Sequence, residues 1–220
     1  MQIYQGKPVY EGIAIGRIRV YTQGKQQIKR QTVNNTDYEL LRFQKAVEDA
    51  KLQLQHLHNT ALMEMGAGNA AVFDMHKAIL EDENYAGDIT HIICQRKCNA
   101  EYAVAVTREK YLQMFGNMED DYMRARALDV RDISERLLEA LQGEEAWRED
   151  TEEPEIVVME DMTPSELMRL NKEKILAFVL SEGSMYSHTV ILAKTLGIPT
   201  IINTHIPTDS EWNGMTAVVD

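Results

Sequence analysis

Apolar residues alternate with small or polar ones near the start of the chain, which is the spacing of a half-buried strand. The stretch from Ile13 to Val20 shows this most clearly, and turns at Gly6-Lys7-Pro8 and at Gly12 interrupt the segment. We therefore predict strands within residues 1–22, followed by a polar linker over residues 23–33.

Apolar residues recur at helical spacing after Asn34, and no proline interrupts this pattern as far as Leu141. Asn35 or Thr36 can cap the first helix, with Glu39 as the second half of a capping box on Thr36. Short connections between the helices favour antiparallel neighbours, hence an all-helical bundle. The predicted helices are a long one from residue 35 to a break at 65–69, one through 72–80, and three over 84–96, 100–115 and 119–141.

Strand character returns beyond an acidic, linker-like stretch over residues 143–154. Thr163, Pro164 and Glu166 form the start signal of a short helix, with Thr163 as its N-cap. A second helix over 190–196 ends at Gly197. The predicted strands are 156–159, 175–180, 198–202 and 217–219, and their alternation with helices is typical of an α/β domain.

The two kinds of pattern imply a discontinuous domain. Residues 1–22 are too few to form a core, so we expect them to pair with residues 146–220 in one α/β domain. The helical bundle, residues 33–143, then becomes an insertion, which a domain tolerates where the inserted ends lie close together at its surface.

Composition narrows the setting of the chain. Its 35 acidic and 23 basic residues give a net charge of −12, which disfavours nucleic acid and anionic membranes and suits a basic protein partner, or simply aids solubility. Cys94 and Cys98 are expected to be unpaired thiols on one helix face rather than a metal site. The first residues lack the pattern of a signal peptide and no apolar run reaches membrane-spanning length, so we expect a cytoplasmic protein. Two cysteines supply too few ligands for a zinc site, so we also expect no bound metal.

The segment most suggestive of chemistry is a loop between the 175–180 strand and the following helix. It contains Gly183, Ser184 and Ser187, and ends in His188 just before the predicted helix start. Backbone N–H groups and the positive end of the helix dipole would then lie near the imidazole, where phosphate oxygens bind readily. Ser184, Ser187 and Thr189 are possible hydrogen-bond donors to such a group. Capping and packing alone would also explain this pattern.

At these residues the sequence resembles the phosphohistidine segment of phosphoenolpyruvate-utilising enzymes. The family pattern is Gly-Gly-x-Thr-Ser-His-x-x-Ile-x-Ala-Arg-x-Leu-x-Ile-Pro-Ala, and the match is most specific from His188 to Pro199. Further segments resemble enzyme I of the sugar phosphotransferase system and extend the resemblance over nearly all 220 residues: 12–16, 73–83, 121–138 and 161–166. The chain departs from the family at Ser184, where the pattern has its second glycine, and at Tyr186, where it has threonine, and Met185 stands where arginine is common.

The resemblance implies an α/β phosphohistidine swivelling domain with an inserted all-α bundle. It also implies phosphoryl transfer from phosphoenolpyruvate through His188 to the histidine carrier protein HPr, supported by Gly183, Ser184, Ser187 and Thr189. HPr would dock on the bundle, and the matching positions are Ala71, His76, Ile79, Leu80, Glu83 and Arg126. Ala67-Gly68 replaces a pair of acids that is common on the carrier-facing helix, which predicts a different carrier affinity or choice.

Enzyme I also has a barrel domain that binds phosphoenolpyruvate and Mg²⁺ and forms a homodimer, and the resemblance does not extend to it. We therefore expect this chain to be the N-terminal part of a longer phosphoenolpyruvate-protein phosphotransferase, with no cofactor of its own. Two alternatives stay open. One is the swivel domain of a dikinase- or synthase-type enzyme, and the other is a catalytically impaired module that only docks a carrier.

Overall fold

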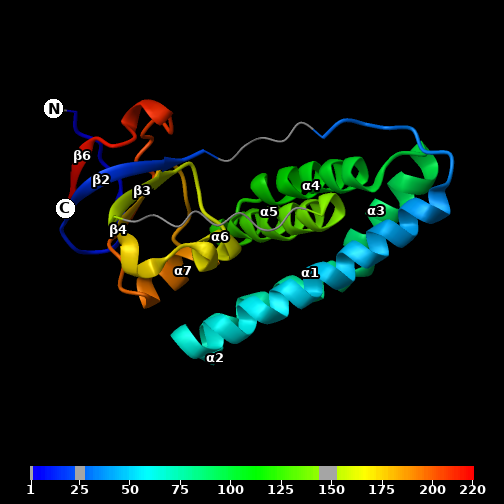
Figure 1. The fold of residues 1–220 in the computed structure, drawn as a ribbon, viewed down its shortest axis with the longest axis horizontal. Coiled ribbons are helices and arrows are strands. Elements are labelled where there is room, and N and C mark those ends of the chain that lie inside the picture. Colours follow the sequence, from blue (N-terminus) through cyan, green and yellow to red (C-terminus); the bar gives the residue numbers. More distant parts are fainter. Residues whose placement is uncertain (1, 23–27, 144–152) are drawn as a thin grey trace. The chain divides into compact units, whose positions relative to one another are not determined.

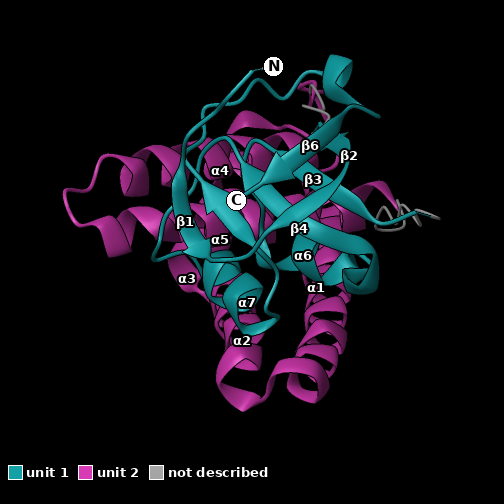
Figure 2. Cartoon of the chain, turned by 90° about the vertical axis from the view of Figure 1, so that its left-hand side faces the viewer, with its two compact units in different colours: residues 1–25, 148–220 teal, residues 26–147 magenta. Residues whose placement is uncertain are grey.

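The computed structural model describes residues 2–22, 28–143 and 153–220. The chain divides into two compact units, one formed by residues 1–25 and 148–220 and the other by residues 26–147 (Figure 2). The first unit is a sheet with helices, and the second is entirely helical among its described elements.

The first unit, in which Figure 1 labels β2, β3, β4 and β6, is built on a six-stranded sheet. Its strand order is β1-β5-β4-β3-β2-β6. The four inner strands β2 to β5 run parallel, whereas β1 and β6 pair antiparallel at the two edges. The strands are β1 (Lys7–Tyr10), β2 (Ala14–Tyr21), β3 (Glu155–Met159), β4 (Ile175–Leu180), β5 (Thr200–Ile202) and β6 (Thr216–Val219).

Burial of the inner strands explains their composition. All five residues of β3 are buried, as expected for a parallel strand that is covered on both faces. Ile18, Ile156 and Ala177 pack on one face of the sheet. Two helices connect the parallel strands, α6 (Pro164–Arg169) between β3 and β4 and α7 (His188–Thr195) between β4 and β5. The carboxyl ends of the parallel strands β3, β4 and β5 therefore point in the same direction, and α7 begins at that end of the sheet.

The second unit contains five helices among its described residues: α1 (Thr36–Met65), α2 (Ala67–Glu81), α3 (Glu83–Arg96), α4 (Ala100–Gly116) and α5 (Asp121–Gln142). The main packing pairs are α1 with α2 and α4 with α5. Phe73, Leu54, Ile89 and Ile133 are fully buried in its core. Tyr85 is buried as well, and its hydroxyl group lies 2.8 Å from the Ser134 Oγ.

The helical elements form where the sequence predicts them, but three local details differ. The predicted break at 65–69 shrinks to Gly66, which has a φ of 82°. Asn35 alone caps α1, and Glu39 does not form a capping box because it bonds to Arg42 and to the Ala100 N–H instead. Cys94 and Cys98 are both free thiols, yet Cys98 follows the end of α3 and so does not share its face.

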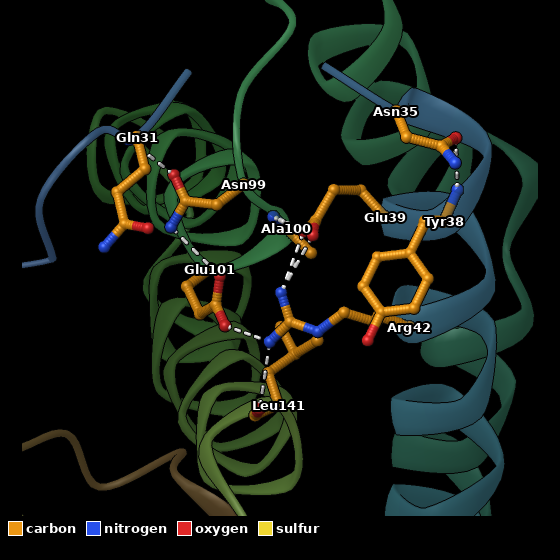
Figure 3. A network of polar contacts seen from close by, with 9 residues as sticks. All are labelled: Gln31, Asn35, Tyr38, Glu39, Arg42, Asn99, Ala100, Glu101 and Leu141. Carbon is orange, nitrogen blue, oxygen red and sulfur yellow. Dashed lines mark hydrogen bonds and ion pairs between the residues drawn. The ribbon is translucent and has the colours of Figure 1, made fainter. Parts of the chain in front are cut away.

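A network of polar contacts joins three helix ends in this unit (Figure 3). The Arg42 guanidinium contacts Glu39 and Glu101 at 2.9 and 2.5 Å and donates to the Leu141 carbonyl at 3.2 Å. Glu39 also accepts from the backbone N–H of Ala100 at 2.9 Å. Residues of α1 thus satisfy backbone groups at the start of α4 and at the end of α5, which intrahelical bonds leave unpaired.

No helix within the described part of the chain has the length and apolar character needed to span a bilayer.

Candidate functional site

The loop between β4 and α7 is tightly turned. Gly183 has a φ of 143°, and a Cβ at this position would lie 3.1 Å from the Cβ of Ile202. The Ser184 hydroxyl accepts a hydrogen bond from the Tyr186 N–H at 3.2 Å, and the Ser184 backbone carbonyl accepts one from the Ser187 N–H at 3.1 Å. These bonds fix the backbone of residues 184–187 immediately before the helix.

His188 is the first residue of α7, whereas the sequence pattern predicted it just outside the helix. Ser187 is the N-cap, and its hydroxyl accepts from the Val190 N–H at 3.2 Å. The backbone N–H groups of the first helical turn have no intrahelical acceptors, and the helix dipole adds partial positive charge there. The half-buried imidazole therefore stands at the end of the helix that favours an anion.

Thr189 anchors this helix start rather than facing a ligand. Its side chain is buried, and its hydroxyl donates to the Met162 carbonyl at 2.6 Å. A hydroxyl has one proton, so Thr189 cannot at the same time donate to a phosphoryl oxygen as the sequence analysis expected. Ser184 and Ser187 act only as acceptors in the bonds above, and each keeps its proton for donation. Met162 directly precedes Thr163, which caps α6 in the predicted capping box with Glu166.

A second segment, residues 203–206, bonds to the end of β4 and to the start of the same loop. The Thr204 N–H and hydroxyl both donate to the Leu180 carbonyl, at 3.2 and 2.9 Å, and the His205 N–H donates to the Ser181 carbonyl at 3.0 Å. The His205 Nδ1 also lies 3.4 Å from a carboxylate oxygen of Glu182.

This segment was not among the residues predicted for the site. Asn203 and His205 have φ values of 56° and 50°, in the left-handed region. Asn and His adopt that region more readily than most residues, so Asn203-Thr204-His205 after an apolar strand was the available signal.

In the helical unit, the structure separates the six predicted partner-binding residues. Ala71 and Glu83 are exposed, and Ile79 and Arg126 are half-buried. His76 and Leu80, in contrast, have exposed fractions of 0% and 1%. These two residues belong to the core and cannot contact a partner, because α2 turns them towards the bundle interior.

His76 is instead the centre of a buried polar group. Its Nε2 lies 3.0 Å from Asp129 Oδ1, and its Nδ1 lies 3.7 Å from Asp132 Oδ2. Asp129 uses its second oxygen to pair with Arg126 at 2.9 Å, and the Arg126 guanidinium stacks over the Tyr122 ring at 4.6 Å from its centroid. A buried ring on α2 is thereby connected through Asp129 to the half-buried arginine on α5.

Among the described residues, no group of three or more His, Cys, Asp or Glu side chains is arranged to hold a metal ion.

Comparison with known proteins assigns both parts of the chain. Residues 5–126 match the family model described as PEP-utilising enzyme, N-terminal, and residues 151–220 match the PEP-utilising enzyme, mobile domain. The phosphoenolpyruvate-protein phosphotransferase of Bacillus subtilis is 31% identical over 221 residues, and that of Staphylococcus carnosus is 31% identical over 217. The chain spans 39% and 38% of the lengths of these relatives.

Solved structures show the same fold. An NMR solution structure of Enzyme I (nEIt) superposes with a TM-score of 0.72 at 29% identity, covering 99% of this chain and 89% of that one. The N-terminal domain of Enzyme 1 - Nitrogen gives 0.62 at 25% identity, covering 99% and 90%. These matches confirm the predicted mixed α/β fold with a helical bundle. The chain therefore belongs to the phosphoenolpyruvate-utilising enzymes, and it corresponds to the N-terminal part of the phosphoenolpyruvate-protein phosphotransferases.

Proposed function

We propose that this chain carries a phosphoryl group on His188 and exchanges it with the histidine carrier protein HPr. The observation that carries the proposal is the position of His188, at the first residue of α7 behind the tight loop of Gly183 and Ser184. The family match over residues 151–220 supports a phosphoryl-transfer role for this segment.

The chemistry needs little beyond positioning and charge stabilisation. A neutral imidazole nitrogen of His188 attacks the phosphorus of phospho-HPr while the nitrogen–phosphorus bond on HPr breaks. The phosphoryl oxygens then lie close to the N-terminal end of α7, where the backbone N–H groups and the hydroxyls of Ser184 and Ser187 can donate hydrogen bonds to them. Gly183 and Thr189 hold the loop and the helix start in place.

The helical unit is the proposed docking surface for HPr. Ala71, Ile79 and Glu83 lie on α2 and at the start of α3, and Arg126 lies on α5. Exposed acids surround the end of α2 at Glu81 and Asp82. Exposed carboxylates near these residues fit a carrier with a basic face, and the net charge of −12 would speed its approach.

The wider role follows from the relatives and is part of the proposal. In the full-length protein, phosphoenolpyruvate would phosphorylate His188 with the help of a Mg²⁺-binding barrel domain. That protein would be a cytoplasmic homodimer of the sugar phosphotransferase system. Phosphoenolpyruvate and Mg²⁺ alone are expected to leave this chain unphosphorylated, since the family resemblance assigns the binding of both to the barrel domain.

The test is intact mass spectrometry of the chain after mixing with phospho-HPr. We expect a gain of one phosphoryl group in the wild type and in His205→Ala, an exposed histidine on the neighbouring segment, and no gain in His188→Ala. A gain in His188→Ala would contradict the assignment. Binding of HPr without phosphorylation of the wild type would favour a module that only docks the carrier. Neither binding nor a gain would favour the swivel domain of a dikinase or synthase.

A further inference from the structure

Two large apolar side chains lie exposed on either side of His188 in the sequence. Tyr186 is 51% exposed and Ile191 is 46% exposed. The other apolar side chains within α7, Val190, Leu192 and Ala193, are at most 4% exposed. Ile191 is therefore the apolar residue of α7 that does not contribute to the core of its unit.

The backbone places both residues close to His188. Residues three apart on a helix are surface neighbours, with Cβ atoms about 5–6 Å apart, so Ile191 shares a face of α7 with His188. Tyr186 directly precedes the N-cap, and the hydrogen bond from its N–H to the Ser184 hydroxyl holds it in the turn. His188 thus has an exposed aromatic residue two positions before it and an exposed aliphatic residue three positions after it.

We infer that Tyr186 and Ile191 form a contact collar that packs against the phosphocarrier protein during transfer. This inference rests on the proposed function. The reacting nitrogen and phosphorus must approach to about 3–3.5 Å, so the carrier surface around its own histidine has to meet the surface around His188. The collar is apolar, so the matching carrier surface is expected to be apolar next to its histidine.

A single exposed apolar residue is normal on any protein and needs no explanation. The collar differs because its two members border the residue at which the partner must arrive. Tyrosine is also among the residue types that dominate binding energy at protein interfaces. The tyrosine at position 186, where the family pattern has threonine, would then adapt this chain to its own carrier.

The experiment measures the initial rate of phosphoryl transfer from phospho-HPr to the chain at increasing phospho-HPr concentration. The variants are Tyr186→Ala, Ile191→Ala and the double variant. Ile15→Ala is the matched control, since Ile15 is 66% exposed in the first half of β2, away from the carboxyl ends of the strands. Each collar variant should raise the half-saturating HPr concentration about tenfold, as expected for a side chain at the centre of an interface. The double variant should raise it further, and Ile15→Ala should change it less than twofold.

Phosphorylation by the small donor phosphoramidate separates the possible outcomes. If the wild type accepts phosphate from neither donor, the proposed function itself fails. If the wild type is active and the collar variants match Ile15→Ala, the collar does not meet the carrier. Equal losses with phospho-HPr and phosphoramidate would also overturn the inference, because Tyr186 or Ile191 would then act on His188 rather than on a protein partner.

Discussion

Gly183 is the residue whose replacement should affect the site most directly without removing a reactive group. An alanine there would have to adopt a φ of 143° and place its Cβ 3.1 Å from that of Ile202. We expect Gly183→Ala to destabilise the chain by about 1–3 kcal/mol, the range for strained backbone conformations. Urea unfolding measures this change.

The matched control for this substitution is Gly87→Ala. Gly87 lies inside α3, and nothing stands within 4 Å of a Cβ at that position. Alanine should stabilise that helix by up to about 1 kcal/mol, because it lowers the entropy cost of ordering the backbone. Similar unfolding midpoints for the two variants would contradict the structural role assigned to Gly183.

Single residues show where sequence reasoning succeeds. The capping box of Thr163 and Glu166 was predicted correctly because both partners lie within one helical turn. The same spacing at Thr36 and Glu39 also predicted a capping box, and that prediction was wrong. Glu39 bonds instead to Arg42 and to the Ala100 N–H, which is distant in sequence. Local spacing cannot reveal such tertiary competition for a side chain.

At the scale of elements, Arg42 connects α1 with α4 and α5 (Figure 3). Arg42→Met would leave the largely buried carboxylates of Glu39 and Glu101 without their cation and the Leu141 carbonyl without its side-chain donor. We expect the free energy of unfolding to fall by about 1–3 kcal/mol. This is less than the full cost of breaking a buried ion pair because Arg42 is partly exposed. Thermal unfolding measures the loss, and hydrogen exchange at the Ala100 amide reports on the network itself.

Lys110→Met serves as the control for Arg42→Met. Lys110 pairs with Asp88 at 2.5 Å, but more than half of the lysine side chain is exposed. Exposed pairs contribute only about 0–1 kcal/mol. Faster exchange at Ala100 in Lys110→Met, or unchanged exchange in Arg42→Met, would argue against the network.

The buried pair of His76 and Asp129 should couple α2 to α5. Asp129→Asn removes the charge that faces both His76 and Arg126, and breaking a buried pair in this way typically costs about 3–5 kcal/mol. His76→Gln should also destabilise the unit, and a double variant should lose less than the sum of the two single losses. Chemical denaturation of the four proteins gives the coupling energy, and strict additivity would refute the coupling.

This pair also shows why the burial of the residues predicted to bind a partner could not be foreseen. Periodicity places His76, Ile79, Leu80 and Glu83 on helices but gives no direction in space. In this bundle α2 packs against α1, α3 and α5, so its apolar and polar residues are buried from several sides. A histidine with aspartate partners more than fifty residues away then belongs to the core, which no spacing rule within α2 indicates.

At the scale of the whole molecule, the topology places a complete helical unit between two neighbouring parallel strands. β2 and β3 pair in register from Arg17 with Glu155 to Tyr21 with Met159, and the chain between them forms the helical unit. Parallel neighbours always need a crossover connection, and here that connection has a core of its own. The change from alternating to helical spacing in the sequence indicated this arrangement, whereas the strand order had no sequence signal.

The stability of the whole molecule should depend on pH in acid solution, because several carboxyl groups are hydrogen-bonded in the folded state. In the helical unit, hydrogen bonds from Lys77 and Lys51 lower the pKa of Asp74 and Glu81, respectively, and the Tyr85 backbone N–H lowers that of Asp82. A carboxyl group with a lowered pKa in the folded state stabilises the fold above its unfolded pKa, which is about 4. That contribution is lost as the pH falls through the folded value.

We therefore expect the unfolding temperature to be nearly constant from pH 7 to about pH 5 and to fall below about pH 4, where the unfolded chain binds more protons. Asp74→Asn combined with Asp82→Asn should flatten this fall, because asparagine keeps an oxygen at both positions but does not titrate. Asp82→Asn also retains an N-cap for α3, so this substitution by itself should change the stability at pH 7 little. Calorimetry from pH 2.5 to 7 on both proteins measures the slopes. Equal slopes would show that the acid sensitivity arises from carboxyl groups other than these two.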